Sequence, residues 1–228
     1  MTRLAWHFLR PGGRLRTGEA APPDGEWLKH DGPIVPCESG LHASERAIDA
    51  LMYAPHEREI VLCRVELAGT VVEHGDPVDK LAASERRILW RLDGEATDRV
   101  LREFARWSAS QVLHLWDAPQ AVRDYLDAGD EMLREAARTA AADAAARAAV
   151  GTAARAAAGA AAWAAAGAAA GVAAVAAAWA SRAAAGAAAW VAAGAAEVVA
   201  WAAAWEADRA AQNTELERLL SEACGARS

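Results

Sequence analysis

Two patterns of hydrophobic and polar residues divide the chain. Near its start, apolar residues alternate with polar ones or gather in short runs, as in 4–9 (LAWHFL) and 59–67 (EIVLCRVEL). These patterns predict strands. Farther along, apolar residues recur at every third or fourth position, which predicts helices over 79–92 and 96–115. Pro119 is expected to open a further helix, because proline is tolerated in a first helical turn.

Shorter signals connect these elements. Residues 11–13 (PGG) are typical of a turn, after which 14–16 is expected to return as a second short strand. A hairpin or tight turn is predicted where His-Asp-Gly-Pro separates 27–28 from 34–35.

A helix and a bend are expected around the long strand. Ser44 is a good N-cap for a helix over 45–53, because its hydroxyl can accept a hydrogen bond from a free amide of the first turn. The strand at 59–67 is expected to bend at Gly69 and to continue the sheet over 70–73.

From Thr139 to Trp205 the chain is mostly alanine, interrupted about every fourth residue by Gly, Trp, Val or Arg. Alanine has the highest helix propensity, whereas each interior glycine costs roughly 1 kcal/mol, so the glycines are expected to end helices or to permit close packing. Breaks near Gly151 and Ser181 predict two or three helices that fold back on one another. An unbroken helix over 128–220, roughly 140 Å long at 1.5 Å per residue, is the alternative. We favour the bundle.

Several tail residues share one face if the helix is counted at 100° per residue, and Trp163 points elsewhere. The face consists of Trp179, Gly186, Trp190, Gly194, Trp201 and Trp205. Alanine has little bulk, so such a face buries area only when another helix approaches closely and a ring lies over glycine or alanine. The pattern therefore predicts self-association or a protein partner, and it predicts that the face is buried.

These elements predict an α+β fold: a small antiparallel or mixed sheet with covering helices, followed by a long alanine-rich, all-helical module. The expected domains are a head at 1–127, the helical module at 128–213 and a short C-terminal amphipathic helix at 214–228. Residues 214–217 (TELE) fit a capping box that would open this last helix.

Composition narrows the function. The 228 residues carry a net charge of −7 and no basic patch with interleaved aromatics, which argues against nucleic-acid binding. Three widely spaced cysteines, Cys37, Cys63 and Cys224, predict a reduced, cytoplasmic setting, and we expect the first two to be buried apolar residues. The six histidines show no metal-ligand spacing, so no metal is expected. The chain carries no familiar catalytic motif.

A membrane role is a further alternative. No charged residue occurs between Arg155 and Arg182, which is long enough to span a bilayer. Membrane insertion is driven by Leu, Ile, Phe and Val, however, and this stretch is chiefly Ala, Gly and Trp. We therefore expect no membrane insertion, and the start of the chain has no apolar run typical of a signal peptide.

Three segments carry a resemblance to a known fold: 6–8 (WHF), 40–53 and 65–69 (VELAG). Together they resemble the NAD-binding half of the ADP-ribosyltransferase fold, as in poly(ADP-ribose) polymerases. In that family a His on the first strand contacts the NAD ribose. A Tyr thirteen residues after a Gly stacks on nicotinamide.

The resemblance implies an NAD site in the head. Its expected contacts are His7, Gly40, His42, Ser44 and Tyr53. Phe8 stands where the family has a glycine, and no catalytic glutamate can be nominated, so the resemblance implies ligand binding rather than efficient transfer.

Residues 37–44 (CESGLHAS), with Asp79-Lys80 and Arg87 downstream, also resemble an uncharacterised domain family of phages and bacteria. Those proteins join such a head to Ala/Gly-rich repeats, and the resemblance reaches about residue 115. It implies no activity, and it implies virion association if the protein derives from a phage. Three hypotheses result: a non-catalytic interaction protein, an NAD-binding or ADP-ribosyltransferase-like protein, and a membrane-active protein.

Overall fold

The structure is a computed structural model that describes residues 2–148, 153–169, 173–193 and 198–225. The fold is α+β, as predicted. The chain divides into two compact units, Met1–Asp98 with Leu220–Ser228, here called the barrel unit, and Arg99–Leu219, here called the helical unit. The domain boundaries expected after residues 127 and 213 both lie inside the helical unit.

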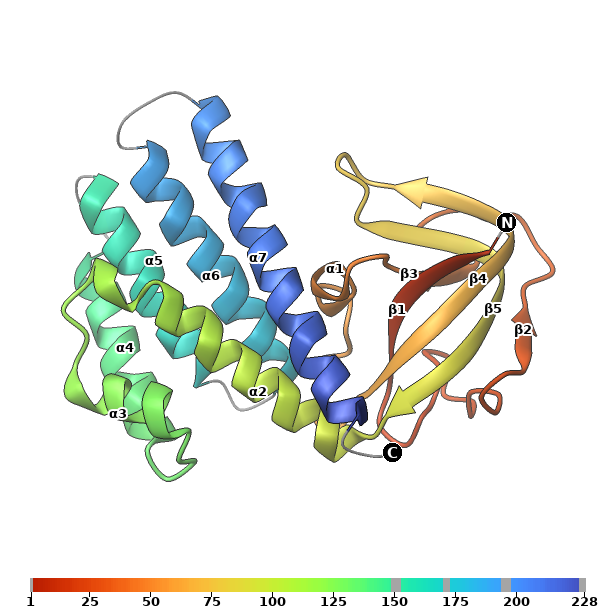
Figure 1. The fold of residues 1–228 in the computed structure, drawn as a ribbon, viewed down its shortest axis with the longest axis horizontal. Coiled ribbons are helices and arrows are strands. Elements are labelled where there is room, and N and C mark those ends of the chain that lie inside the picture. Colours follow the sequence, from red (N-terminus) through yellow and green to blue (C-terminus); the bar gives the residue numbers. More distant parts are fainter. Residues whose placement is uncertain (1, 149–152, 170–172, 194–197, 226–228) are drawn as a thin grey trace. The chain divides into compact units, whose positions relative to one another are not determined.

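One antiparallel sheet forms the barrel unit (Figure 1). Its elements in chain order are β1 (Arg3–Leu9), β2 (Trp27–Lys29), β3 (Leu41–Ala43), α1 (Ala47–Leu51), β4 (Val61–His74) and β5 (Lys80–Leu92). The strand order is β1-β4-β5-β2, and β3 also pairs with β5. The first strand is confirmed, and the long strand with its continuation past Gly69 is confirmed as β4.

The sheet curls into a small barrel. Directly after β3, the Trp6 amide donates to the Ser44 carbonyl at 2.7 Å, and the Ser44 amide donates back to the Trp6 carbonyl at 3.0 Å. This pair of bonds joins β3 to β1, so the circuit β1-β4-β5-β3 returns to its start. Closure satisfies strand edges that would otherwise be left unpaired.

Alternating side chains fill the barrel interior. The buried cluster is Ala5, Leu9, Ala43, Val61, Cys63, Val65, Leu67, Leu81, Ala83 and Ile88. Several of these side chains are small, and the alternation along β1 turns His7 to the same side as Ala5 and Leu9. A polar residue therefore stands on the barrel's apolar face.

The helix predicted over 79–92 is wrong, because this segment is strand β5. Its interior positions include Leu81, Ala83 and Ile88, so the spacing of two is interrupted. The β4–β5 ladder has two register irregularities, which change the side on which later residues point. The interrupted spacing resembles that of a helix, and the Arg and Glu residues of this segment have high helix propensity. Pairing with the neighbouring strands nevertheless determines its conformation.

Other local predictions fail for related reasons. The expected strand at 14–16 contributes only isolated bridges of Arg14. The predicted hairpin is also wrong, since Trp27–Lys29 pairs with β5 instead of with 34–35. Ser44 does not cap α1. The N-cap residue is Arg46, which forms no side-chain cap hydrogen bond, and the Ser44 backbone instead forms the two hydrogen bonds to Trp6 that close the barrel.

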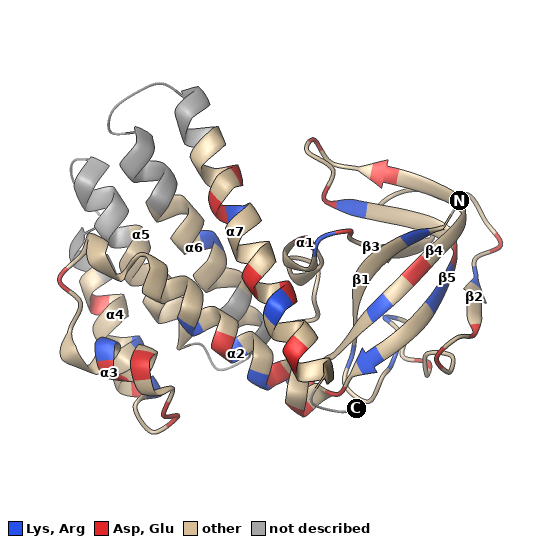
Figure 2. Cartoon of the chain, in the orientation of Figure 1, with Lys and Arg blue, Asp and Glu red and all other residues tan. Residues whose placement is uncertain are grey.

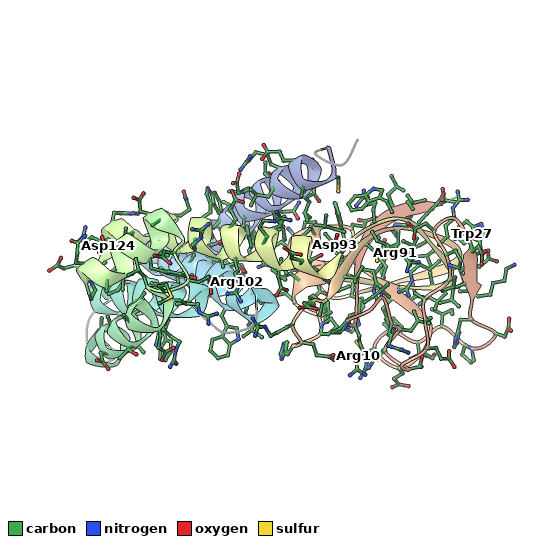
Figure 3. The ribbon with its side chains drawn as sticks, turned by 90° about the horizontal axis from the view of Figure 1, so that it is seen from below. Arg10, Trp27, Arg91, Asp93, Arg102 and Asp124 are labelled. Carbon is green, nitrogen blue, oxygen red and sulfur yellow. The ribbon has the colours of Figure 1, made fainter. Side chains whose placement is uncertain are left out.

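After β5, the described residues form six helices (Figure 1). They are α2 (Gly94–Gln111), α3 (Gln120–Ala128), α4 (Arg134–Ala148), α5 (Ala153–Ala168), α6 (Ala173–Ala193) and α7 (Val198–Gly225), with a short 3-10 turn at Leu113–Leu115. Asp93 caps the start of α2 by accepting a bond from the Ala96 amide at 2.9 Å (Figure 3). Helix α5 packs against both α4 and α6, which confirms the folded-back arrangement.

Two predicted helix limits are wrong. Ser181 lies inside α6, and its hydroxyl donates to the Ala178 carbonyl of the same helix. Ser181 therefore does not break the helix. Thr214 lies inside α7 and donates to the Ala210 carbonyl, so it opens no new helix. The break expected near Gly151 falls outside the described residues.

Close approach of alanine-rich helices depends on glycine. A Cβ atom at Gly167 of α5 would lie 3.0 Å from the backbone nitrogen of Ala180 and 3.0 Å from the Trp179 Cβ, both on α6. A Cβ atom at Gly186 of α6 would lie 3.7 Å from the Trp205 ring of α7. The predicted packing of a ring over glycine is present at this second position.

Candidate functional site

A cluster of polar side chains in the barrel unit surrounds Cys37. The Cys37 thiol lies 3.6 Å from His74 Nε2 and 3.6 Å from Lys80 Nζ, which donates to it. The Cys37 amide donates to His42 Nε2 at 3.1 Å. We call these four residues the Cys37 cluster.

Barrel closure assembles this cluster from distant parts of the chain. His74 ends β4 and Lys80 begins β5, so both belong to the same hairpin. His42 lies on β3, which pairs with β5 at Ala82, and the loop just before β3 supplies Cys37. Cys37 adopts φ +69°, a conformation that is uncommon outside glycine and is found more often at functional sites.

Tyr53 and Asp79 hold Lys80 in place. The Lys80 ammonium lies 3.5 Å from the centre of the Tyr53 ring, a cation–π contact. The Tyr53 hydroxyl donates to Asp79 Oδ2 at 2.7 Å. Burial and the Asp79 carboxylate raise the pKa of Tyr53, so the phenol stays a neutral donor.

A hollow of about 250 Å³ adjoins this group. Its lining comes from the start of α1 and from the β4–β5 hairpin: Glu45, Arg46, Asp49, Pro77, Val78, Asp79, Lys80 and Leu81. Arg46 and Asp49 form an ion pair with each other. Asp79 Oδ1 is buried and has no hydrogen-bond partner. The hollow thus presents both charges and one carboxylate oxygen able to accept a further bond.

A second polar group lies on the inner side of the barrel. Arg86 is 5% exposed and donates from Nη1 to the His42 carbonyl at 2.7 Å. It forms no ion pair with a carboxylate among the described residues, and burial lowers its pKa to about 10. His7 is hydrogen-bonded to the His42 backbone, and burial together with the Arg86 charge holds its pKa well below the usual 6.5.

The residues expected to contact NAD do not lie together at one site. The His42 ring belongs to the Cys37 cluster and Tyr53 adjoins it at Lys80, whereas His7 contacts the backbone of His42. Ser44 is buried and used in barrel closure, and Gly40 occupies a turn with φ +104° that favours glycine. Neither His7, Gly40, His42, Ser44 nor Tyr53 lines the hollow itself.

Sequence reasoning missed the centre of this cluster. Cys37 was expected to be buried but is exposed, while Cys63 is buried as predicted. His74 gave no signal, and Lys80 stood only in the motif of the uncharacterised family, with no role implied, because a helix is predicted where β5 begins. The Pro-Cys-Glu-Ser-Gly context of Cys37 is typical of an exposed turn and was the available clue.

The helical unit presents a different feature, an apolar surface patch. Trp163 on α5 is 49% exposed, and Trp179 on α6 is 57% exposed. A Cβ atom at Gly167 would lie 3.0 Å from the Trp179 Cβ, and Trp163 lies one helical turn before Gly167, so the two tryptophans stand on the same stretch of the α5–α6 pair. We call Trp163 and Trp179 the tryptophan patch.

The face predicted from the tail sequence is only partly described. Trp179 is exposed, while Gly186 and Trp205 contact each other. Gly194 and the side chains of Trp190 and Trp201 lie outside the described residues. The single-helix count does not apply, because Trp179 and Trp205 belong to separate helices, α6 and α7.

Two classes of site are absent from the described ranges. No group of three or more His, Cys, Asp or Glu side chains there is placed to hold a metal ion. None of the helices described has both the length and the apolar character needed to cross a membrane.

Residues 17–100 match a protein family described as a domain of unknown function (DUF7666). The match covers most of the barrel unit, including the Cys37 cluster, and ends in α2. No curated protein and no solved structure shows a significant match to the chain.

Proposed function

We propose that this is a non-catalytic interaction protein, in which the barrel unit is joined to an alanine-rich helical unit that binds a second copy of the chain. The tryptophan patch supports this proposal. Trp163 and Trp179 are the two tryptophans that stand among the exposed large hydrophobic residues of the described chain. Exposed indoles on neighbouring helices are typical of protein interfaces.

The surroundings of the patch suit a close helix–helix contact. Helices α5 and α6 consist largely of alanine and carry few charged residues (Figure 2). Their small side chains would let a second pair of helices approach until each indole lies over an alanine surface. A second copy offers the same combination of rings and alanine, so one patch can serve as its own partner.

The area sets the expected strength. A tryptophan buries up to about 250 Å² in all, so the half-exposed rings offer roughly 100 Å² each. Four rings in a symmetric dimer would cover roughly 400 Å², equivalent to about 10 kcal/mol at 25 cal/mol per Å². Association itself costs about 4–15 kcal/mol. At most about 6 kcal/mol remains, so we expect a weak dimer, with a dissociation constant on the order of tens of micromolar or above.

Sedimentation velocity tests the proposal. The wild-type chain should pass from monomer to dimer between about 5 and 500 µM, and about 0.5 M salt should favour the dimer by screening the net charge of −7. The double variant Trp163→Gln/Trp179→Gln should stay monomeric. Leu4→Gln, at a 53% exposed position of the barrel unit, is the control for lost surface hydrophobicity and should dimerise normally. Equal association of all three chains would contradict the proposal.

A second candidate function is binding of NAD or a fragment of it in the barrel unit. Tyr53 and Lys80 favour this candidate because they bring an aromatic ring and a cation to the edge of the hollow. At about 250 Å³ the hollow is smaller than common cofactor pockets of about 300–1,000 Å³, so it suits one half of the dinucleotide.

Calorimetric titration distinguishes this candidate. Saturable NAD binding that is lost in Tyr53→Ala and in His7→Ala would support the site implied by the resemblance. Binding lost only in Tyr53→Ala would place the ligand at the hollow without that resemblance. No heat at millimolar NAD would remove this candidate and leave the interaction proposal untouched.

A further inference from the structure

The three cysteines have different surroundings. Cys63 lies inside the barrel, fully buried, and burial raises its pKa to about 12. Cys224 is half-buried near the end of α7. Cys37 is exposed and is the cysteine that has both an imidazole and an ammonium group 3.6 Å from its sulfur. Thiols beside cationic groups are the reactive ones in proteins, and buried thiols are inert.

A neutral imidazole and an ammonium group act on Cys37 from a prepared geometry. His74 Nε2 can take the proton of the thiol, while the Lys80 ammonium faces the sulfur as it becomes negative. The Tyr53 ring and the Tyr53–Asp79 hydrogen bond hold Lys80 beside the sulfur. The bond from the Cys37 amide to His42 fixes the backbone. A nucleophile, a proton acceptor and an orienting layer are therefore all present.

We propose that Cys37 is a nucleophilic thiol that exchanges with low-molecular-weight disulfides. His74 accepts the thiol proton, and the Cys37 sulfur attacks one sulfur of the disulfide. A new sulfur–sulfur bond forms to Cys37 as the old one breaks. The other half leaves as a thiolate and takes up the proton from His74. One disulfide is consumed and one is formed, so no other oxidant or reductant is needed.

Two small disulfides of opposite charge test the proposal: dithiobis(nitrobenzoic acid), which is anionic, and cystamine, which is cationic. Both should modify one thiol of the folded wild-type chain rapidly, and peptide mass spectrometry should identify it as Cys37. Cys37→Ser should abolish this phase, whereas the matched variant Cys224→Ser should retain it. A rapid phase that survives in Cys37→Ser would overturn the proposal.

Variants of the neighbours test activation. His74→Gln and Lys80→Met should each slow the reaction at least about fivefold with both reagents, and Lys80→Arg should restore much of the rate because it restores the cation. These positions lie at or near the surface, and circular dichroism checks that each variant folds. Unchanged rates in His74→Gln and Lys80→Met would overturn the assignment. So would slowing with the anionic reagent alone, because Lys80 would then merely attract that probe.

Discussion

Replacing Tyr125 by phenylalanine removes one buried hydrogen bond and leaves the shape of the ring unchanged. Tyr125, on α3, is 1% exposed, and its hydroxyl donates to the Ala168 carbonyl at 3.1 Å. Ala168 is the last residue of α5 and is fully buried, so its carbonyl has no partner within its own helix. The tyrosine therefore supplies a hydrogen bond to the end of an alanine-rich helix.

The expected cost follows from this burial. Loss of the hydroxyl removes the partner that this buried carbonyl has among the described residues, which costs about 1–3 kcal/mol in free energy of unfolding. For a unit of this size, each kcal/mol lowers the melting temperature by about 4 °C, so Tyr125→Phe should lower it by roughly 4–12 °C.

Differential scanning calorimetry with urea unfolding measures this effect. The chain has two tyrosines, so Tyr53→Phe makes the same chemical change at a 45% exposed position and is a matched control. Its hydrogen bond to Asp79 is accessible to water, so its loss should cost well under about 1 kcal/mol. Equal melting temperatures for Tyr125→Phe and the wild type would refute the reasoning. Equal losses in both variants would refute it as well.

Three further predictions concern the barrel and the helices. Burial lowers the pKa of His7, so below about pH 6.5 the unfolded chain takes up a proton that the folded chain does not, and the free energy of unfolding falls with pH. His7→Gln should therefore lose less stability to urea than the wild type from about pH 7.5 to 5. Gly167→Leu should destabilise the helical unit by about 1–3 kcal/mol through overpacking against α6, while Ala211→Leu, at an exposed helix position, should not, as thermal melts would show. Asp93→Ala should cost about 1 kcal/mol in chemical unfolding, because an amide of the first turn of α2 loses its cap.

Strands with a regular pattern could be predicted from sequence, and the irregular one could not. β1 and β4 were found because their apolar and β-branched residues follow strand patterns. β5 carries two irregularities in its ladder with β4, so its apolar residues follow neither period cleanly. Only pairing with β3 and β4, which are distant in sequence, determines its conformation.

Non-local pairing also determines how much of the candidate site could be predicted from the sequence. Tyr53 and His42 were named from a motif, and the structure brings both beside Lys80 and Cys37. The contacts of His74 and Lys80 with Cys37 could not be predicted, because they depend on barrel closure rather than on spacing along the chain. The predicted face assumed one continuous helix. Trp179 and Trp205 belong to separate helices, so they do not share a face in the way the 100° count predicts.

Oxidative footprinting tests the central claim, self-association through the tryptophan patch, most directly. Trypsin cleavage after Arg155 and Arg182 places Trp163 and Trp179 in one peptide, whose oxidation mass spectrometry can follow. Raising the protein from about 5 to 500 µM should protect both indoles as the dimer forms, whereas Met132, 87% exposed on the same unit, should oxidise equally at both concentrations. Equal oxidation of the two tryptophans at both concentrations would contradict the account.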